Sequence, residues 1–353
     1  MSLLRRFLYL VGDDFAESSY SLRRIDMSRF FFPPSSSSEG VPTPLDRTGG
    51  AGATCPQSTL DARSGLVDFV LFKNKGHDGE NLRVVAIDLD GGTLVCDPSA
   101  PPVVEPLTFP AAPKLMPFSL TVGDRLYVLD AFSDEPDSSF EALYRSHVRS
   151  RFYTEWCWQP LPAPPYVHGR RNDDTSSSRY VKSCAVVAGT DILVSSRGGR
   201  TYRFDTVESA WTVAGDWPLP FSGLAEYVPE HRLWFGLSSS GQPRAPAIGV
   251  GGDDDGSACG PRLLEGPPPA WRLVRSYAVH LGYSKFCIAR FFEIGKRHLQ
   301  VVCPDDTRMA FETEDLQLVL TGVEVESCGQ ELRVVKHKSG RYKLTVDGEY
   351  SNF

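Results

Sequence analysis

Histidine, cysteine and carboxylate residues are the side chains here best suited to hold a metal ion, and they do not occur in a metal-binding pattern. The seven histidines are scattered, with no HxH or HExxH pair and none beside a CxxC, so zinc has no local ligand pair. The acidic run Asp253–Asp255, inside GVGGDDDGSACG, lacks the spacing and the terminal glutamate of an EF-hand. We therefore predict no metal site and interpret the run as a solvated loop. Scattered ligands that converge in a central channel are the alternative.

Nucleophilic catalysis and phosphate binding each need a local pattern that this sequence lacks. It contains no GxSxG elbow, and no cysteine and histidine have a spacing that marks a catalytic pair. The stretch GVGGDDDG lacks the lysine and the following serine or threonine of a P-loop, and Asp254 stands where GxGxxG needs glycine. Its carboxylates would also repel phosphate. The sequence predicts no catalytic residue and no bound cofactor.

The charge balance excludes a broad class of partners. The chain of 353 residues has 37 Lys and Arg against 44 Asp and Glu, a formal net charge of −7. Sequence-independent binding of nucleic acid needs a wide basic surface that displaces counterions. The basic groups here are short and interrupted by acids: Arg5–Arg6, Arg23–Arg24, Arg170–Arg171 and HVRSR at 147–151. We expect no nucleic-acid partner.

The N-terminal stretch MSLLRRFLYLVGDD is predicted to be the first strand rather than a signal peptide. Its apolar run at 7–11 is shorter than the ~7–15 residues of a signal-peptide core, and Asp13 and Asp14 end it. No run approaches the ~18 apolar residues of a membrane-spanning helix. The eight cysteines contain no CxxC pair, which is typical of reduced thiols. We expect a cytoplasmic or nuclear protein, or one present in both places, with no membrane partner.

Short β-prone runs separated by turn residues dominate the chain. The turns are rich in Gly, Asp, Asn and Pro, which supply the backbone angles that a strand reversal needs. The stretch with the best helical character, 138–150, has the strand-like core FEALY. We predict an all-β fold, with strands including 7–11, 66–72, 82–88, 92–97, 125–131, 191–196, 201–206, 232–238, 298–303, 331–337 and 341–347.

A repeated unit organises these strands. At 118–165 and at 183–220 an apolar strand, a Gly-Asp or Gly-Thr-Asp turn, a second apolar strand and an aromatic-bearing strand are followed by Trp and a Pro-rich exit. A weaker copy covers 223–240 with Trp271, and two divergent copies cover about 283–320 and 322–347. A four-stranded antiparallel sheet cannot bury both faces alone, so several must stack around an axis. The tryptophans are expected to pack between neighbouring sheets.

The repeats predict a β-propeller with six blades, with seven left open. The spacing is irregular, because Asp124 and Asp191 are 67 positions apart and a regular blade takes ~40–50 residues. The N-terminal strand would complete the last blade and so remove a sheet edge. We expect a single domain, 1–353, in which 33–53, 169–179 and 241–269 are disordered or loop insertions.

Three long stretches resemble a known family. RRFLYLV, SLTVGDRLYVLD and the region 183–240, which begins SCAVVAGTDILVSSRGGRTYRFDT, are similar to the cereal-expanded plant family catalogued as domain of unknown function 1668. The resemblance covers nearly the whole chain and implies a propeller similar to kelch and galactose-oxidase-type propellers. The double glycine of kelch is not regular here, and Gly198–Gly199 falls in the turn after the second strand. No F-box-like helical segment precedes the repeats, so an adaptor role in ubiquitin ligation is not expected, and the family implies no catalytic residues.

Three functions fit these observations. A non-catalytic scaffold would bind another protein through a loop-bearing face of the propeller. A small-molecule-binding protein or enzyme would use the central channel, where polar groups would converge. A lineage-specific member with no essential role is the third reading. We predict the scaffold, a monomer that is not an enzyme and whose partner is another protein.

Overall fold

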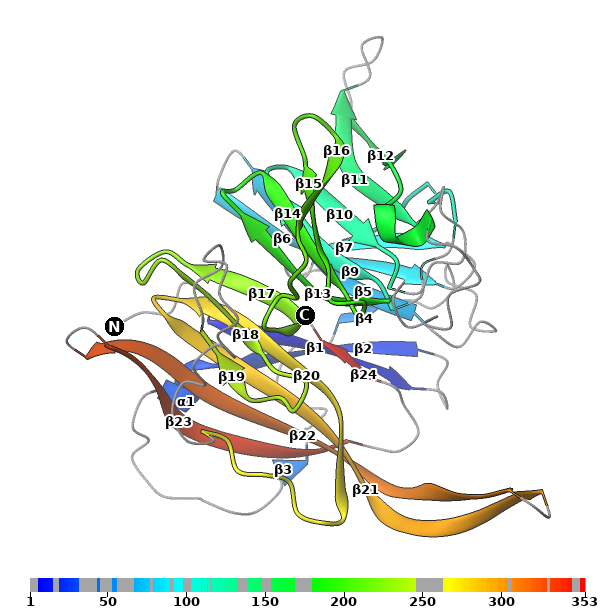
Figure 1. Ribbon diagram of the computed structural model, residues 1–353, viewed down its shortest axis with the longest axis vertical. Helices are drawn as coiled ribbons and strands as arrows, with labels where there is room; N and C mark the ends of the chain where they lie inside the picture. Colours follow the sequence, from blue (N-terminus) through cyan, green and yellow to red (C-terminus); the bar gives the residue numbers. More distant parts are fainter. Residues whose placement is uncertain are drawn as a thin grey trace.

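The computed structural model of the chain is built almost entirely from β-strands, which confirms the predicted all-β class (Figure 1). The helical elements described are α1 (Ser28–Phe31) and a short 3-10 helix, Pro165–His168. None of the helices in the described part of the chain has the length and apolarity to cross a membrane. The structure describes residues 6–14, 19–31, 43–44, 53–55, 67–76, 79–88, 92–97, 103–108, 110–112, 114, 116–131, 139–147, 154–168, 180–245, 263–303, 306–328, 331–344 and 350–352.

The middle of the chain folds into three consecutive antiparallel meanders. The first consists of β5 (Val67–Gly76), β6 (Gly79–Asp88), β7 (Thr93–Asp97) and β8 (Val103–Pro106). The second consists of β9 (Phe118–Val122), β10 (Arg125–Leu129), β11 (Phe140–His147) and β12 (Thr154–Pro160). The third consists of β13 (Val181–Val187), β14 (Asp191–Ser196), β15 (Thr201–Asp205) and β16 (Ala210–Gly215). The repeats predicted at 118–165 and 183–220 coincide with the second and third meanders, so that part of the prediction is confirmed.

Three further groups of strands complete the fold. The first holds β17 (Ser222–Val228), β18 (Leu233–Leu237) and β19 (Pro243–Arg244), and β17 pairs in parallel with β13. The second holds β20 (Trp271–Gly282), β21 (Lys285–Cys303), β22 (Asp306–Cys328) and β23 (Glu331–Leu344), with β3 (Thr43–Pro44) on its edge. The third joins the two chain ends and holds β24 (Tyr350–Asn352), β1 (Phe7–Asp14), β2 (Ser19–Asp26) and β4 (Ala53–Cys55). The N-terminal part therefore closes the fold as expected, with three strands rather than one.

Clusters of buried apolar side chains lie between neighbouring sheets and close a ring. One pair of residues from each cluster, going round, is Val11 with Leu94, Phe72 with Leu126, Leu129 with Val194, Leu193 with Ala225, Phe235 with Phe286, and Leu320 with Leu10. The first strands β5, β9, β13, β17 and β20 follow one another along the inside of this ring, and β24 lies beside β5. The fold is a β-propeller. The number of blades in the chain, six with seven left open, stays a prediction.

Tryptophans link neighbouring sheets, as the repeat pattern predicts. Trp156 on β12 packs edge-on against Phe72 on β5, with ring centroids 5.7 Å apart. Trp211 on β16 donates a hydrogen bond from Nε1 to the carbonyl oxygen of Pro162, at 2.7 Å, beyond the end of β12. Trp234 on β18 donates from Nε1 to the carbonyl oxygen of Val186 on β13, at 3.3 Å. Trp156 and Trp211 therefore join two meanders, and Trp234 joins β18 to β13 across the parallel β13–β17 pair.

The repeat prediction is wrong for the C-terminal third. The regions 283–320 and 322–347 are not separate units, because β21, β22 and β23 pair within one sheet. The expected boundary lies inside β22, where Thr321 pairs with Ser339 and their hydroxyl oxygens are 2.9 Å apart. Trp271, assigned to the copy at 223–240, begins β20 and packs against Phe292 of the next sheet instead.

The expected insertions are described only in part. From 33–53 the structure describes β3 and the first residue of β4. From 241–269 it describes 241–245 and 263–269, which are joined by two hydrogen bonds between the side-chain amide of Gln242 and the backbone of Leu264. The rest of these two ranges, and all of 169–179, lie outside the described residues.

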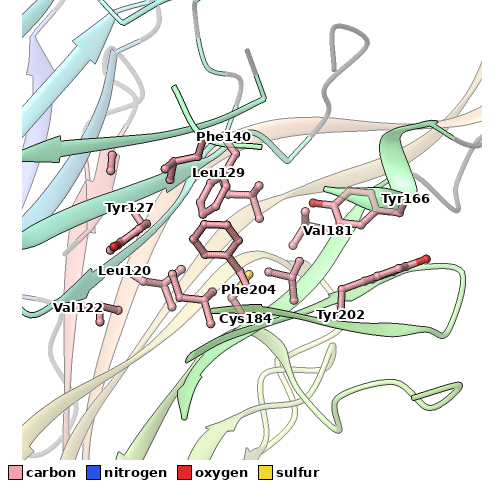
Figure 2. Close-up of a cluster of buried hydrophobic side chains, with 14 of the residues drawn as sticks. Leu120, Val122, Tyr127, Leu129, Phe140, Tyr166, Val181, Cys184, Tyr202 and Phe204 are labelled. Carbon is pink, nitrogen blue, oxygen red and sulfur yellow. The ribbon is translucent and has the colours of Figure 1, made fainter. Parts of the chain in front are cut away.

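The largest inter-sheet cluster centres on aromatic rings from two sheets (Figure 2). Phe204 on β15 meets Phe140 on β11 edge to face, with centroids 4.8 Å apart, and both side chains are fully buried. We expect Phe204→Ala to lower the free energy of unfolding by about 3–5 kcal/mol, because it removes a buried ring and leaves a cavity between two sheets. Chemical denaturation measures this change.

A matched control lies on the same hairpin. Val207, in the turn after β15, is 73% exposed, so Val207→Ala is expected to change the free energy of unfolding by no more than about 0.5 kcal/mol. Equal effects of the two substitutions would show that the ring of Phe204 does not hold the sheets together.

Asp26 fastens the end of β2 to the helix that follows. It accepts hydrogen bonds from the guanidinium of Arg6, and from the backbone N–H of Ser28 at 2.9 Å. The bond from Arg6 lowers the pKa of Asp26 from 3.8 to about 2. The ionised carboxylate therefore contributes stability above pH ~4, and this contribution is lost as the pH falls towards 2.

We expect Asp26→Asn to cost about 1 kcal/mol at pH 7, a modest value because the Arg6 side chain is largely exposed. The difference in unfolding free energy between wild type and variant should shrink between pH 4 and pH 2. Denaturation curves across that range measure it, and Arg6→Gln should reduce the same pH dependence. A difference that stays constant with pH would contradict the assignment.

Candidate functional site

The most deeply buried charges belong to the scaffold and not to a reactive centre. Lys114 and Glu141 form an ion pair in which both side chains are 0% exposed. The Nζ atom of Lys114 also donates to the carbonyl oxygen of Ala112 at 2.8 Å, and the backbone N–H of Ala111 donates to Glu141 at 2.9 Å. These bonds tie the connection between β8 and β9 to β11. A substrate in solvent cannot reach either group.

A second polar cluster lies where β21, β22 and β23 run side by side. Glu324 accepts a hydrogen bond from the Nζ atom of Lys285, its partner in the β21–β22 register, and its other oxygen lies 3.0 Å from Nε2 of His337. The β20–β21 turn beside it places Tyr283 and Ser284 at positive φ, 50° and 60°. Lys285 and His337 both contact the carboxylate of Glu324, so we interpret this cluster as an internal polar network that joins the three strands.

A third cluster stabilises the β15–β16 turn. Arg203 binds Asp191 across the β14–β15 pair, with Nε 2.8 Å from the carboxylate. Asp205 accepts hydrogen bonds from the backbone N–H groups of Glu208 and Val207, and these bonds lower the pKa of Asp205. The carboxylate of Asp205 therefore shapes the turn that leads into β16.

The histidines whose side chains the structure describes do not come together. His231 contacts the carbonyl oxygen of Val325 at 3.0 Å, and Nδ1 of His280 lies 3.6 Å from Glu226. Within the described residues no three His, Cys, Asp or Glu side chains are grouped closely enough to hold a metal ion. Asp253–Asp255, the run considered for calcium, lies outside the described residues. The absence of metal, cofactor and catalytic residues stays a prediction.

Exposed large apolar side chains lie on several elements of the described chain. Leu224 and Tyr227 on β17 and Val274 on β20 belong to the inner strands. Val207 and Val213 belong to the hairpin of β15 and β16 on the outside of the third meander. Single exposed apolar residues are ordinary in proteins, but a group of them on one strand is a feature of binding surfaces.

The most prominent feature of the surface is an arm made from the ends of β21 and β22 (Figure 1). β20 pairs with β21 only as far as Ile294, and β23 pairs with β22 only from Leu316. We call residues 295–315 the arm; its described strands, 295–303 and 306–315, form a ribbon in which Gly295 pairs with Thr313 and Cys303 with Asp306. At ~3.3 Å per residue, its strand in β21 extends about 30 Å. Among the described strands, none pairs with the arm from outside.

Sequence reasoning missed the arm, although a signal for it exists. The stretch KFCIARFFEIGKRHLQVVC contains no Pro, Asn or Asp, and the first turn residues after it are Pro304 and Asp305. A single long strand followed by one sharp turn would have predicted a long hairpin. The predicted strand 298–303 is the end of that strand.

The buried pair allows a direct test of its structural role. We expect Glu141→Gln to lower the free energy of unfolding by about 3–5 kcal/mol, because it leaves the ammonium of Lys114 buried without a counter-charge. The double variant Lys114→Met/Glu141→Leu removes both charges, so it should recover much of the loss. Chemical denaturation of both variants measures this. A double variant less stable than Glu141→Gln would show that the charges themselves are needed.

Comparison with solved structures gives several similarities at low identity. One is the SapL1 lectin in complex with alpha methyl fucoside, 9% identical, covering 77% of this chain and 95% of that one, at a TM-score of 0.31. Another is YjhT, 12% identical, covering 80% and 98%, at 0.33. A third is apo AztD from Citrobacter koseri, 9% identical, covering 94% and 98%, at 0.31. At these TM-scores the similarities carry no argument about this chain.

The sequence comparison is more specific. No curated protein matches the chain. Residues 5–342 match a family described as "Protein of unknown function (DUF1668)", which is the family that the stretches around 183–240 resemble. The plant origin implied by that resemblance stays a prediction. Because the match spans nearly the whole sequence, the chain belongs to the DUF1668 family.

Proposed function

We propose that this protein is a non-catalytic scaffold that binds another protein, acting as a monomer in the cytoplasm, the nucleus or both. The observation that carries the proposal is the arm, residues 295–315, which extends beyond the sheet that supports it. An enzyme that works within a propeller would need no such extension. A protein that holds a partner gains contact area from it.

The energetics of the arm support this role. A two-stranded ribbon on its own is marginally stable in water, because it has no third strand and no packed face to offset its loss of conformational entropy. Both outer edges of such a ribbon also present backbone N–H and C=O groups to solvent, which natural proteins normally avoid. A partner that pairs with an edge, or packs on the ribbon, would stabilise it.

The polar clusters are consistent with a scaffold. Lys114 with Glu141, and Lys285 with Glu324, are ion pairs within the fold. Catalytic groups are usually presented to a cleft with perturbed titration and a reachable substrate position. The described clusters instead tie strands and connections to one another.

A second candidate function, binding of a small molecule near the ring axis, is favoured by one observation. His280 on β20 lies beside Glu226 on β17, and both strands run along the inside of the ring. The exposed side chains of Leu224, Tyr227 and Val274 belong to the same two strands. Apolar surface next to a few polar groups is the usual composition of a ligand site.

The arm provides the test of the scaffold. A variant in which Asn-Gly replaces residues 295–314 joins Ile294 to Asp315, its partner in the β21–β22 register, by a tight turn and keeps the β20–β23 sheet. We expect at least one protein to co-purify with the wild-type chain in a stoichiometric amount, and its recovery to fall at least tenfold with the armless variant. Quantitative mass spectrometry of the purified complexes measures both.

A matched control changes a turn at the other end of β21. Tyr283→Asn/Ser284→Gly places residues that favour positive φ where the chain already has it, so it should leave partner recovery unchanged. Failure of the wild-type chain to recover a stoichiometric partner would overturn the scaffold proposal. Equal recovery by the armless variant would remove the arm from it.

A further inference from the structure

β16 (Ala210–Gly215) is the last strand of its sheet and has an open edge. It pairs with β15 from Ala210 opposite Asp205 to Gly215 opposite Thr201, with a register shift at Ala214. On its other side no strand pairs with it in the described part of the chain. Alternate backbone N–H and C=O groups of an edge strand point away from the sheet, so they are available to a further strand.

The other outer strands carry features that discourage pairing. β12 contains Glu155 and ends at Pro160, β8 ends with Glu105 and Pro106, and β19 is a two-residue strand that begins with Pro243. β4 has three residues, and β23 carries Arg and Lys residues along its length and pairs with β3 only at Tyr342 and Lys343. Charge, proline, shortness and cover are the usual protections of an edge. Among the outer strands that the structure describes, β16 has no charged residue, proline or covering strand in its sequence AWTVAG, and the register shift at Ala214 leaves Ala210–Val213 regularly paired.

β16 is also held in place. The ring of Trp211 packs against Phe204 and Phe140, at centroid distances of 5.0 and 5.5 Å, and its Nε1–H group donates to the carbonyl oxygen of Pro162. The side chain of Val213, two residues further along, is 57% exposed. A strand fixed by a neighbouring sheet and open along its edge is pre-organised, so a ligand that pairs with it loses less entropy.

Area and charge identify the kind of occupant. Edge-to-edge pairing of two six-residue strands buries less than the ~1,200 Å² of a stable protein interface, which argues against a second copy of this chain. The stretch 204–217 contains Asp205, Glu208 and Asp216 and no Lys or Arg. Glu208 precedes the strand and Asp216 follows it, and Asp216 is 77% exposed although it binds Arg200. A segment with basic residues at both ends is complementary to this edge.

We propose that the open edge of β16 binds an extended peptide segment of a partner protein, which adds a fifth strand to the third meander. The segment alternates β-branched or apolar residues over about six positions and has Lys or Arg at each end. Backbone hydrogen bonds provide the affinity, and contacts with Val213 and the flanking carboxylates provide the preference for that sequence. This inference deepens the proposed scaffold function and rests on it, at a site separate from the arm.

The test begins with a library of random 12-residue peptides displayed on phage and selected on the full-length protein. We expect the enriched peptides to share the alternating pattern with basic ends. Synthetic, fluorescently labelled copies of these peptides are then titrated with the wild-type protein and with two variants. Val213→Lys adds a charge to the edge, and Val207→Lys adds the same charge in the adjacent turn. Affinity measured by fluorescence anisotropy should fall at least tenfold for Val213→Lys and less than threefold for Val207→Lys.

A second measurement needs no change to the protein. Methylation of the peptide amides at one alternating set of positions should abolish binding, while methylation at the other set should leave the affinity within about threefold, because only one set faces β16. Three results would each overturn the proposal. The first is an equal loss of peptide affinity for both methylated sets, and the second is an equal loss for the two lysine variants. The third is a selection in which no peptide is enriched on the wild-type protein relative to Val213→Lys.

Two further measurements distinguish binding at the β16 edge from binding at the arm and from dimerisation. The armless variant should bind the same peptides as the wild type, so a failure at β16 leaves the arm untouched, and loss of peptide binding without the arm would overturn the edge proposal. A wild-type chain that sediments as a dimer, and as a monomer after Val213→Lys, would assign the edge to a second copy and also overturn it.

Discussion

The structure depends on the packing of apolar side chains between neighbouring sheets. Each sheet has two faces to bury, and the helical elements that the structure describes, of four residues each, are too short to cover one of them. Clusters such as the one around Phe140 and Phe204 take side chains from two sheets at once, so the stability of each sheet depends on both of its neighbours. The cycle closes where Val11 meets Leu94 and Leu10 meets Leu320, which is why both chain ends must enter one sheet.

Buried polar groups have their own partners in the fold. Lys114 lies in the connection between the first and second meanders, and Glu141 lies on the second, so their ion pair fixes the connection to the sheet. Such a pair adds little net stability but strongly disfavours arrangements that separate its charges. Trp211 and Trp234 act in the same way through single hydrogen bonds, to the carbonyl oxygen of Pro162 beyond the end of β12 and to that of Val186 on β13. The apolar clusters hold the ring together, and these bonds set how each sheet sits in it.

The sequence predicts the meanders well because their signals are local. The turn between Val122 and Arg125, and the turn before Asp191, follow from Gly and Asp residues, and the strands beside them follow from β-branched and aromatic runs. The C-terminal sheet is mispredicted, because Lys338–Gly340 resembles a turn yet stays extended where Gly340 approaches Phe30 of α1. That contact joins residues more than 300 positions apart, so no local pattern could report it. The candidate binding surfaces could not be predicted for the same reason, because whether the edge of β16 is open depends on which strands pair elsewhere in the chain.

The ring arrangement also determines which strands keep an unpaired edge. Closure gives each inner strand a neighbour, as β13 shows by pairing with β17, but it does nothing for the outer strand of each sheet. Those strands must be protected one by one, as Glu155 and Pro160 protect β12 and as Arg and Lys residues protect β23. Some outer strands also contribute to the clusters, as Trp156 of β12 does, but an exposed side chain such as Val213 of β16 can change without loss of packing between the sheets. An outer edge can therefore gain a binding role without loss of the fold, and the uncharged β16 and the extended β21–β22 hairpin are where this chain departs from that protection.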